Sequence, residues 1–199
     1  MNYPKIIFKY SWIYDQTWKE RLIGKKTRKY PSSKRILNYI KKVEKLWRKE
    51  EERILLELSK ISHLKWKSKF IYCYVVGQCK PFSEPLTMPV YEKFPDYFID
   101  VLTHELIHNL FIQPGNYQKS KKAWEYFHQK YKKFSRNTII HIPLHAIHSH
   151  IYYKFFDEKR LKRDIELISF LPDYKKSWQI VKKEGYKNII NEFVKRMGS

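Results

Sequence analysis

Cysteine and glycine are scarce in this sequence, and long apolar runs are missing from it. The 199 residues include 2 Cys and 5 Gly. Two thiols exclude a framework of several disulfides and a zinc ribbon with four cysteine ligands. No apolar run approaches the ~20 residues that cross a bilayer, and the first residues lack the apolar core of a secretory signal. We therefore expect a cytoplasmic protein without a membrane span.

Aromatic and apolar residues, in contrast, are abundant. Aromatic residues make up 17% of the chain and hydrophobic residues 43%. These contents exclude a chain that is disordered throughout, and the length fits a single domain. We expect one catalytic domain over residues 1–199, with an N-terminal arm over 1–33, a core over 34–156 and a helical extension over 157–199.

Positive charge dominates, but it is unevenly distributed. The chain has 41 Lys and Arg against 20 Asp and Glu, a formal net charge of +21. Residues 1–69 hold 20 basic and 7 acidic residues, residues 70–117 hold 2 and 5, and residues 118–199 hold 19 and 8. Two basic arms therefore flank a nearly neutral middle. Such arms favour an anionic partner, and nucleic acid is the partner we consider for them.

The pattern of apolar residues predicts an α+β protein. Helical steps predict a long helix from Ser33 to Ile61, preceded by a loop over 24–33. Aromatic and β-branched residues predict strands over 70–76 and 86–91. Pro89 cannot donate a backbone hydrogen bond, which predicts that the second strand lies at a sheet edge. Further helices are expected over residues 10–23, 96–113, 119–134, 143–156 and 174–196.

The helix expected over 96–113 carries His104, Glu105 and His108 in the order H-E-x-x-H. Two histidines four residues apart project from one helix face and can bind one tetrahedral metal ion. Glu105 points about 100° around the helix, where it can transfer protons beside the ion as a general base and acid. Uncharged neighbours favour burial of this helix, and buried polar groups need partners. The motif therefore predicts a Zn²⁺ site with Glu105 as its catalytic residue.

The third zinc ligand is less well defined by the sequence. Candidates are His141, His145 and His148, which share one face of a helix, and Glu125 on the preceding helix. We favour His145, because Pro143 fits the first turn of a helix. His145 then lies inside the ordered helix, whereas His141 lies at or before its cap.

The segment from Val101 to Leu110 resembles the motif helix of zincin metallopeptidases, and the order of elements is similar over about residues 34–156. The resemblance implies a zincin-like fold, with a long backing helix and the motif helix packed on a small sheet that has an exposed edge strand. It also implies zinc-dependent hydrolysis of peptide bonds in a protein or peptide substrate. In that family the edge strand holds the substrate in extended form, a role that falls to Leu86–Tyr91 here.

The branch of the family depends on the third ligand. Phe111 and Pro114 stand where a metzincin has Gly and His. A histidine ligand on a later helix is similar to the SprT-like branch, whose members act on proteins attached to DNA, although the cysteines for that branch's zinc ribbon are lacking. The chain also looks similar to the minigluzincins but lacks their glutamate ligand.

Two other functions remain open. The chain is also compatible with a basic nucleic-acid-associated protein in which the metal is structural. A latent protease acting on DNA-bound proteins, blocked by its own arm over 1–33, is the other alternative.

Other residues are candidates for supporting roles in the zinc site. Asp100 could orient His104 through its carboxylate, and a phenol of Tyr117, Tyr152 or Tyr153 could stabilise an oxyanion.

Overall fold

The computed structural model describes residues 3–22 and 29–197, which form two compact units. The first unit is drawn from residues 1–55 and 68–109, and the second from residues 56–67 and 110–199. Residues 24–28 of the loop predicted over 24–33 lie outside the described residues. Within the described ranges, no helix combines the length and apolar character that a membrane crossing requires.

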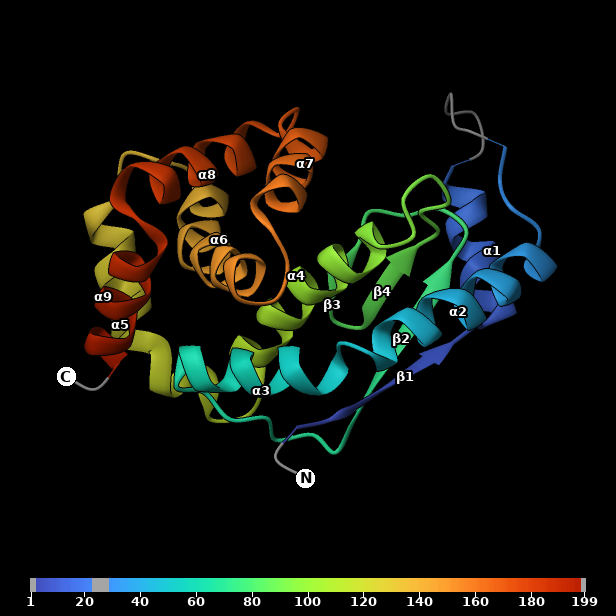
Figure 1. The fold of residues 1–199 in the computed structure, drawn as a ribbon, viewed down its shortest axis with the longest axis horizontal. Coiled ribbons are helices and arrows are strands. Elements are labelled where there is room, and N and C mark those ends of the chain that lie inside the picture. The colour runs from blue at the N-terminus through green and yellow to red at the C-terminus, as the bar shows by residue number, and fades with distance from the viewer. Residues whose placement is uncertain (1–2, 23–28, 198–199) are drawn as a thin grey trace. The chain divides into compact units, whose positions relative to one another are not determined.

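The fold class is α+β, as predicted, with a small mixed sheet and a helical C-terminal half (Figure 1). In chain order the described elements are β1 (Lys5–Lys9), α1 (Trp12–Arg21), α2 (Ser33–Arg48), α3 (Glu51–Ser62), β2 (Phe70–Val76), β3 (Phe82–Ser83), β4 (Leu86–Pro89), α4 (Tyr97–Ile112), α5 (Asn116–Lys130), α6 (Arg136–Phe155), α7 (Glu158–Ile168), α8 (Pro172–Glu184) and α9 (Tyr186–Met197).

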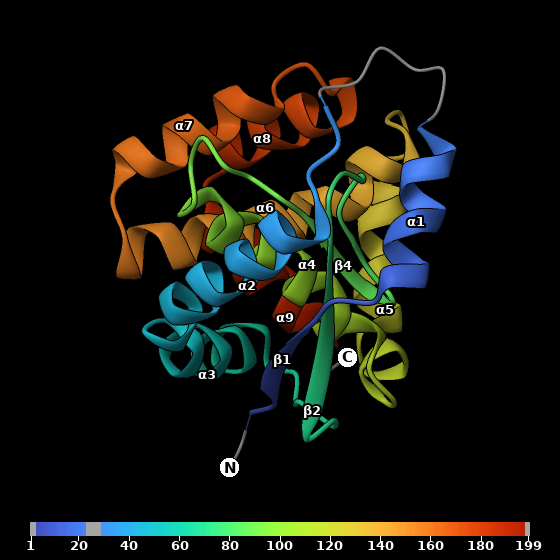
Figure 2. The same cartoon turned by 90° about the vertical axis from the view of Figure 1, so that its right-hand side faces the viewer.

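The sheet of the first unit has the strand order β1-β2-β4-β3. Strands β1, β2 and β4 are parallel, with Ile6 opposite Ile71 and Val75 opposite Met88, and β3 pairs antiparallel with β4. Figure 2 shows β1 lying beside β2. Strand β1 falls within the stretch that the sequence suggested to be an arm, and its Ile6 is fully buried. Strand β1 therefore contributes to the core of this unit.

The prediction that residues 86–91 form an edge strand is wrong. Strand β4 lies between β2 and β3, and all four of its residues are buried. Strand β3 pairs with Leu86 and Thr87 only, so Pro89 lies beyond that ladder and interrupts none of its hydrogen bonds. The strand at this end of the sheet is the two-residue β3.

The prediction of a single long helix from Ser33 to Ile61 is also wrong, because the helix is interrupted between α2 and α3. Helix α2 has Ser32 as its N-cap, and α3 begins at Glu51. The break brings the Glu51 carboxylate to the outer edge of β1, where it accepts hydrogen bonds from Ile6 N at 2.8 Å and Trp47 Nε1 at 3.1 Å. Glu51 therefore accepts a hydrogen bond from a backbone N–H of β1 that faces away from β2.

In the second unit, α6 packs against α8 and α9, and α5 packs against α9 (Figure 1). The start predicted for α6 is wrong: the helix begins at Arg136, and Pro143 lies inside it. Ser135 is the N-cap and accepts from Thr138 N at 3.0 Å. The final helix predicted over 174–196 is two helices, because Gly185 adopts a φ of 82° between α8 and α9. Helix α7 was not predicted.

Candidate metal centre

Helix α4 places the H-E-x-x-H motif in a buried stretch of chain. His104 is 7% exposed and Glu105 5% exposed, whereas His108 is half-buried. Pro114 follows the end of the helix, where a further turn would need its missing N–H. The predicted burial of this helix is confirmed, because its uncharged residues Leu102, Leu106, Ile107 and Leu110 are buried as well.

His104 and His108 project from one face of α4. Their ring centroids are 5.0 Å apart, and the ring planes are inclined at 69°. One helical turn separates the two residues, which accounts for the approach of the rings. The pair is the arrangement that the motif predicted.

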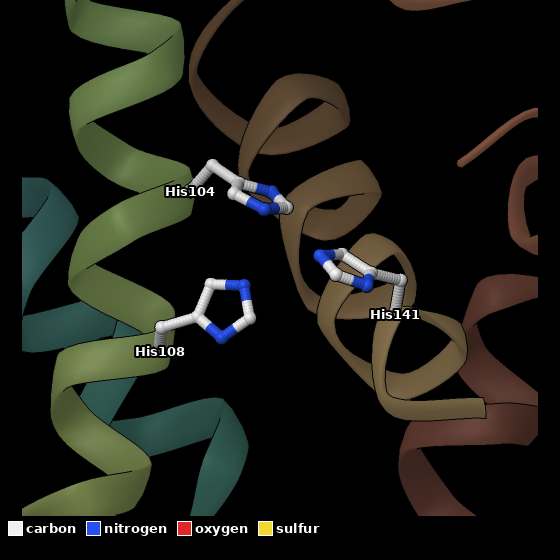
Figure 3. A group of neighbouring side chains, drawn as sticks. All are labelled: His104, His108 and His141. Carbon is white, nitrogen blue, oxygen red and sulfur yellow. The ribbon is translucent and has the colours of Figure 1, made fainter. Parts of the chain in front are cut away.

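His141, from α6, completes a group of three histidines (Figure 3). The ligand atoms of His104, His108 and His141 all lie within 4.8 Å of one another. Figure 3 shows the three rings turned toward one another. The arrangement could hold a metal ion.

His141 is oriented by the backbone of its own helix. Its Nδ1 lies 2.7 Å from the carbonyl oxygen of Asn137. A carbonyl only accepts hydrogen bonds, so Nδ1 must carry the proton and donate it. In the neutral ring the lone pair is then on Nε2, which is the nitrogen suited to bind a metal.

Glu105 lies beside His104 in the sequence but is not a member of the histidine group. Burial raises the pKa of Glu105 to about 8, and the positive charge of Lys80 acts against this shift. Burial, and then the charge of Glu105, raise the pKa of the Cys79 thiol to about 12. The loop before β3 therefore lies within electrostatic range of this carboxyl. A carboxyl with a pKa near neutrality can both accept and release a proton.

His145, which the sequence favoured as the third ligand, has other neighbours. The residue is fully buried, and its Nδ1 lies 2.8 Å from Ser177 Oγ. Its ring stacks on Trp178, with centroids 4.1 Å apart and an interplanar angle of 8°. The structure thus packs His145 against α8 and brings His141 to the other two histidines.

The remaining ligand candidates also lie outside the group. His148 is buried, with its Nδ1 3.9 Å from Asp164 Oδ2. Burial, and then the charge of Arg160, lower the pKa of His148 to about 3, so the ring is neutral at neutral pH. Glu125 is exposed and lies 3.9 Å from Lys121.

The residues considered for supporting roles lie in very different environments. Asp100 is 1% exposed, in the first turn of α4. Tyr152 is buried and contacts the His148 ring at a centroid distance of 4.7 Å. Tyr117 and Tyr153 are 55% and 50% exposed, and Tyr153 stacks on Tyr186. These tyrosines do not share one environment that would identify an oxyanion donor.

Two positions near the motif were not identified from the sequence. Asn109 Nδ2 donates to the carbonyl of Ser83 at 3.2 Å, which ties α4 to β3. The N-cap Ser135 defines the start of α6 and hence the place of His141 inside it. Serine is a favoured N-cap residue, so Ser135 is a possible helix start in the sequence as Pro143 is.

No family model, no curated protein and no solved structure matches this chain.

Proposed function

We propose that this chain is a zinc-dependent peptidase in which His104, His108 and His141 hold the metal and Glu105 transfers the protons. The observation that carries the proposal is the approach of three histidine ligand atoms to within 4.8 Å of one another, next to a buried glutamate. His141 takes the place that the sequence favoured for His145.

The donor set fits zinc. Three imidazoles are a ligand set of catalytic zinc sites, which keep one further position for water or substrate. The hydrogen bond from His141 Nδ1 to the Asn137 carbonyl resembles the outer partners that orient metal-binding histidines. When bound, zinc supplies Lewis acidity that lowers the pKa of water to ~7 and polarises a carbonyl.

Glu105 performs the proton transfers in this proposal. Its carboxylate accepts a proton from the attacking water and then donates it to the leaving amine of the cleaved peptide. The burial that raises its pKa favours the first step, since a carboxylate of higher pKa is the stronger base. A dication bound nearby would lower the pKa, which would keep Glu105 ionised before that step and make it the better acid in the second.

Strand β3 is the best candidate to align the substrate. It is the strand at the end of the sheet beyond β4, and Asn109, next to His108, donates to its Ser83 carbonyl. An extended peptide can add to a sheet through main-chain hydrogen bonds at such an edge. We therefore transfer to β3 the substrate role that the sequence suggested for residues 86–91.

Metal content tests the proposal. The full-length protein, purified and dialysed against buffer containing zinc, is expected to retain about one zinc per chain, as one three-histidine site implies. It is also expected to cleave unfolded casein, and a chelator should remove the activity and zinc restore it. A folded protein that takes up no zinc would overturn the proposal.

The structural-metal alternative is tested by access to the ion. A structural zinc has four protein ligands, whereas a catalytic zinc keeps an exchangeable position. A peptide hydroxamate should therefore bind the zinc-loaded protein and leave the zinc-free protein unbound. Equal binding to both forms would favour a closed site.

A further inference from the structure

The first turn of α8 holds the start of α6. The carboxylate of Asp173, in that turn, accepts hydrogen bonds from Thr138 Oγ1 at 2.8 Å, from Asn137 Nδ2 at 3.1 Å and from Ser135 Oγ. Ser135 is the N-cap of α6. One side chain thus restrains three of the first residues of the helix that carries His141.

Asn137 links this carboxylate to the proposed metal ligand. Its side-chain amide donates to Asp173, while its backbone carbonyl accepts from His141 Nδ1 at 2.7 Å. The carbonyl determines which imidazole nitrogen carries the proton and how the ring is turned. Movement of Asn137 would therefore change the direction in which His141 presents Nε2.

The residue after Asp173 contacts the same ring. Tyr174 lies with its ring centroid 4.2 Å from that of His141, at an interplanar angle of 37°. The first turn of α8 therefore acts on the imidazole in two ways, through Asn137 and through direct ring contact. Neither contact requires α8 to supply a metal ligand.

We propose that Asp173 is a positioning residue for the metal site, which holds Asn137 so that its carbonyl orients His141 for zinc. The inference rests on the proposed function. It assigns to α8 a role in metal affinity through an aspartate that need not touch the ion. Outer partners of metal-binding histidines typically contribute 10–100-fold to metal affinity, which is the range we expect here.

A matched control separates positioning from helix capping. Asp157 is the N-cap of α7 and accepts from Arg160 N at 2.7 Å, so it also supports the start of a helix in the second unit. Its bond serves only its own helix, whereas Asp173 bonds to residues of α6. If the role of Asp173 is purely structural, replacing either aspartate should lower stability, and neither replacement should weaken zinc binding more than the other.

The experiment compares D173A with D157A in the full-length protein. Zinc dissociation constants are measured by competition with a chelator of known affinity, and thermal stability is measured on the zinc-free forms. D173A is expected to weaken zinc binding 10–100-fold, and D157A to leave it within about twofold. N137A, which removes the amide and keeps the carbonyl, should weaken it in the same direction, and it replaces D173A if that variant does not fold.

The outcomes distinguish this inference from the proposed function. Zinc binding by D173A or N137A as tight as in the unsubstituted protein would overturn the positioning role and leave the metal site intact. An equal loss of zinc affinity in D157A would show that Asp173 only stabilises the fold, which also overturns it. Failure of the unsubstituted protein to bind zinc would overturn the proposed function itself.

Discussion

Helices α4 and α6 both carry several histidines, but they hold them in different ways. On α4, His104 and His108 face each other across one turn, with ring centroids 5.0 Å apart. On α6, His141, His145 and His150 have polar contacts at 2.7–2.8 Å, with Asn137, Ser177 and Glu57, and His148 Nδ1 lies 3.9 Å from Asp164 Oδ2. Helical spacing brings the rings of the first pair together, whereas the neighbours of α6 differ from one of its histidines to the next.

This difference explains how one helix can contribute a single ligand from a run of histidines. His145 is enclosed by α8, and His148 is kept neutral by burial. His141 alone of the α6 histidines joins the pair on α4 in the described part of the chain. Of the four histidines on α6, His145 and His148 therefore serve packing, His150 contacts Glu57, and His141 binds the metal in our proposal.

The largest effect is expected on α4, at the proposed proton carrier. Glu105→Gln is nearly isosteric, removes the base and keeps the three histidines. Cleavage of casein should fall by about 10²–10⁴-fold, the contribution of a positioned acid or base, while zinc content stays at the level of the unsubstituted protein. Unchanged cleavage would show that Glu105 does not carry the protons.

The next prediction compares two histidines of α6. His141→Gln should weaken zinc binding on the order of 10²–10³-fold, since it removes one of three ligands from a site worth several kcal/mol per ligand. His145→Gln should change zinc affinity little and lower thermal stability, because the residue packs against Ser177 and Trp178. The reverse pattern would restore His145 as the third ligand.

His148 provides a prediction on the pH dependence of stability. Its pKa is about 3 in the folded protein against 6.5 when unperturbed. Between these values the unfolded chain binds more protons, so stability falls as the pH falls from about 6.5 toward 3, by at most about 1.4 kcal/mol per pH unit for this group.

Urea unfolding of the zinc-free protein at several pH values measures this slope. His148→Gln removes the titrating ring, and its stability should fall less steeply with decreasing pH than that of the unsubstituted protein. Parallel curves for the two proteins would contradict the burial account of His148.

The smallest effect concerns the basic regions that lie outside the nearly neutral segment around α4. If lysines of α8 contact phosphates, binding of a DNA duplex should weaken with salt, with a slope of about −0.9 per contact. Lys182 and Lys183 are exposed on that helix, and replacing one of them with Gln should flatten the change in affinity between 50 and 200 mM salt by roughly threefold to fourfold. An affinity that does not depend on salt would argue against phosphate contacts by these residues.

Patterns in the sequence correctly predicted the features that depend on a single helix or strand. The boundaries of β2 and the course of α4 follow the expected ranges closely, because burial of apolar residues acts along each element. The H-E-x-x-H spacing placed His104 and His108 together because helix geometry requires it. That residues 1–199 form one domain remains a prediction.

Features that depend on several elements were not predictable in this way. The break before α3 lets Glu51 bond to Ile6, a partner 45 residues away. Similarly, Pro143 fits a helix start by sequence, whereas in the structure Ser135 caps the helix and Pro143 lies buried inside it. That shift of about two turns places His141 inside the helix, so local spacing could not predict which histidine of α6 joins His104 and His108.

The central claim is that three histidines from α4 and α6 hold zinc. Its most direct test is a crystal structure of the zinc-loaded protein, with anomalous scattering measured on both sides of the zinc absorption edge. Our account predicts one zinc peak bound by the imidazoles of His104, His108 and His141. A peak coordinated by other residues, or no zinc peak beside this histidine group, would contradict it.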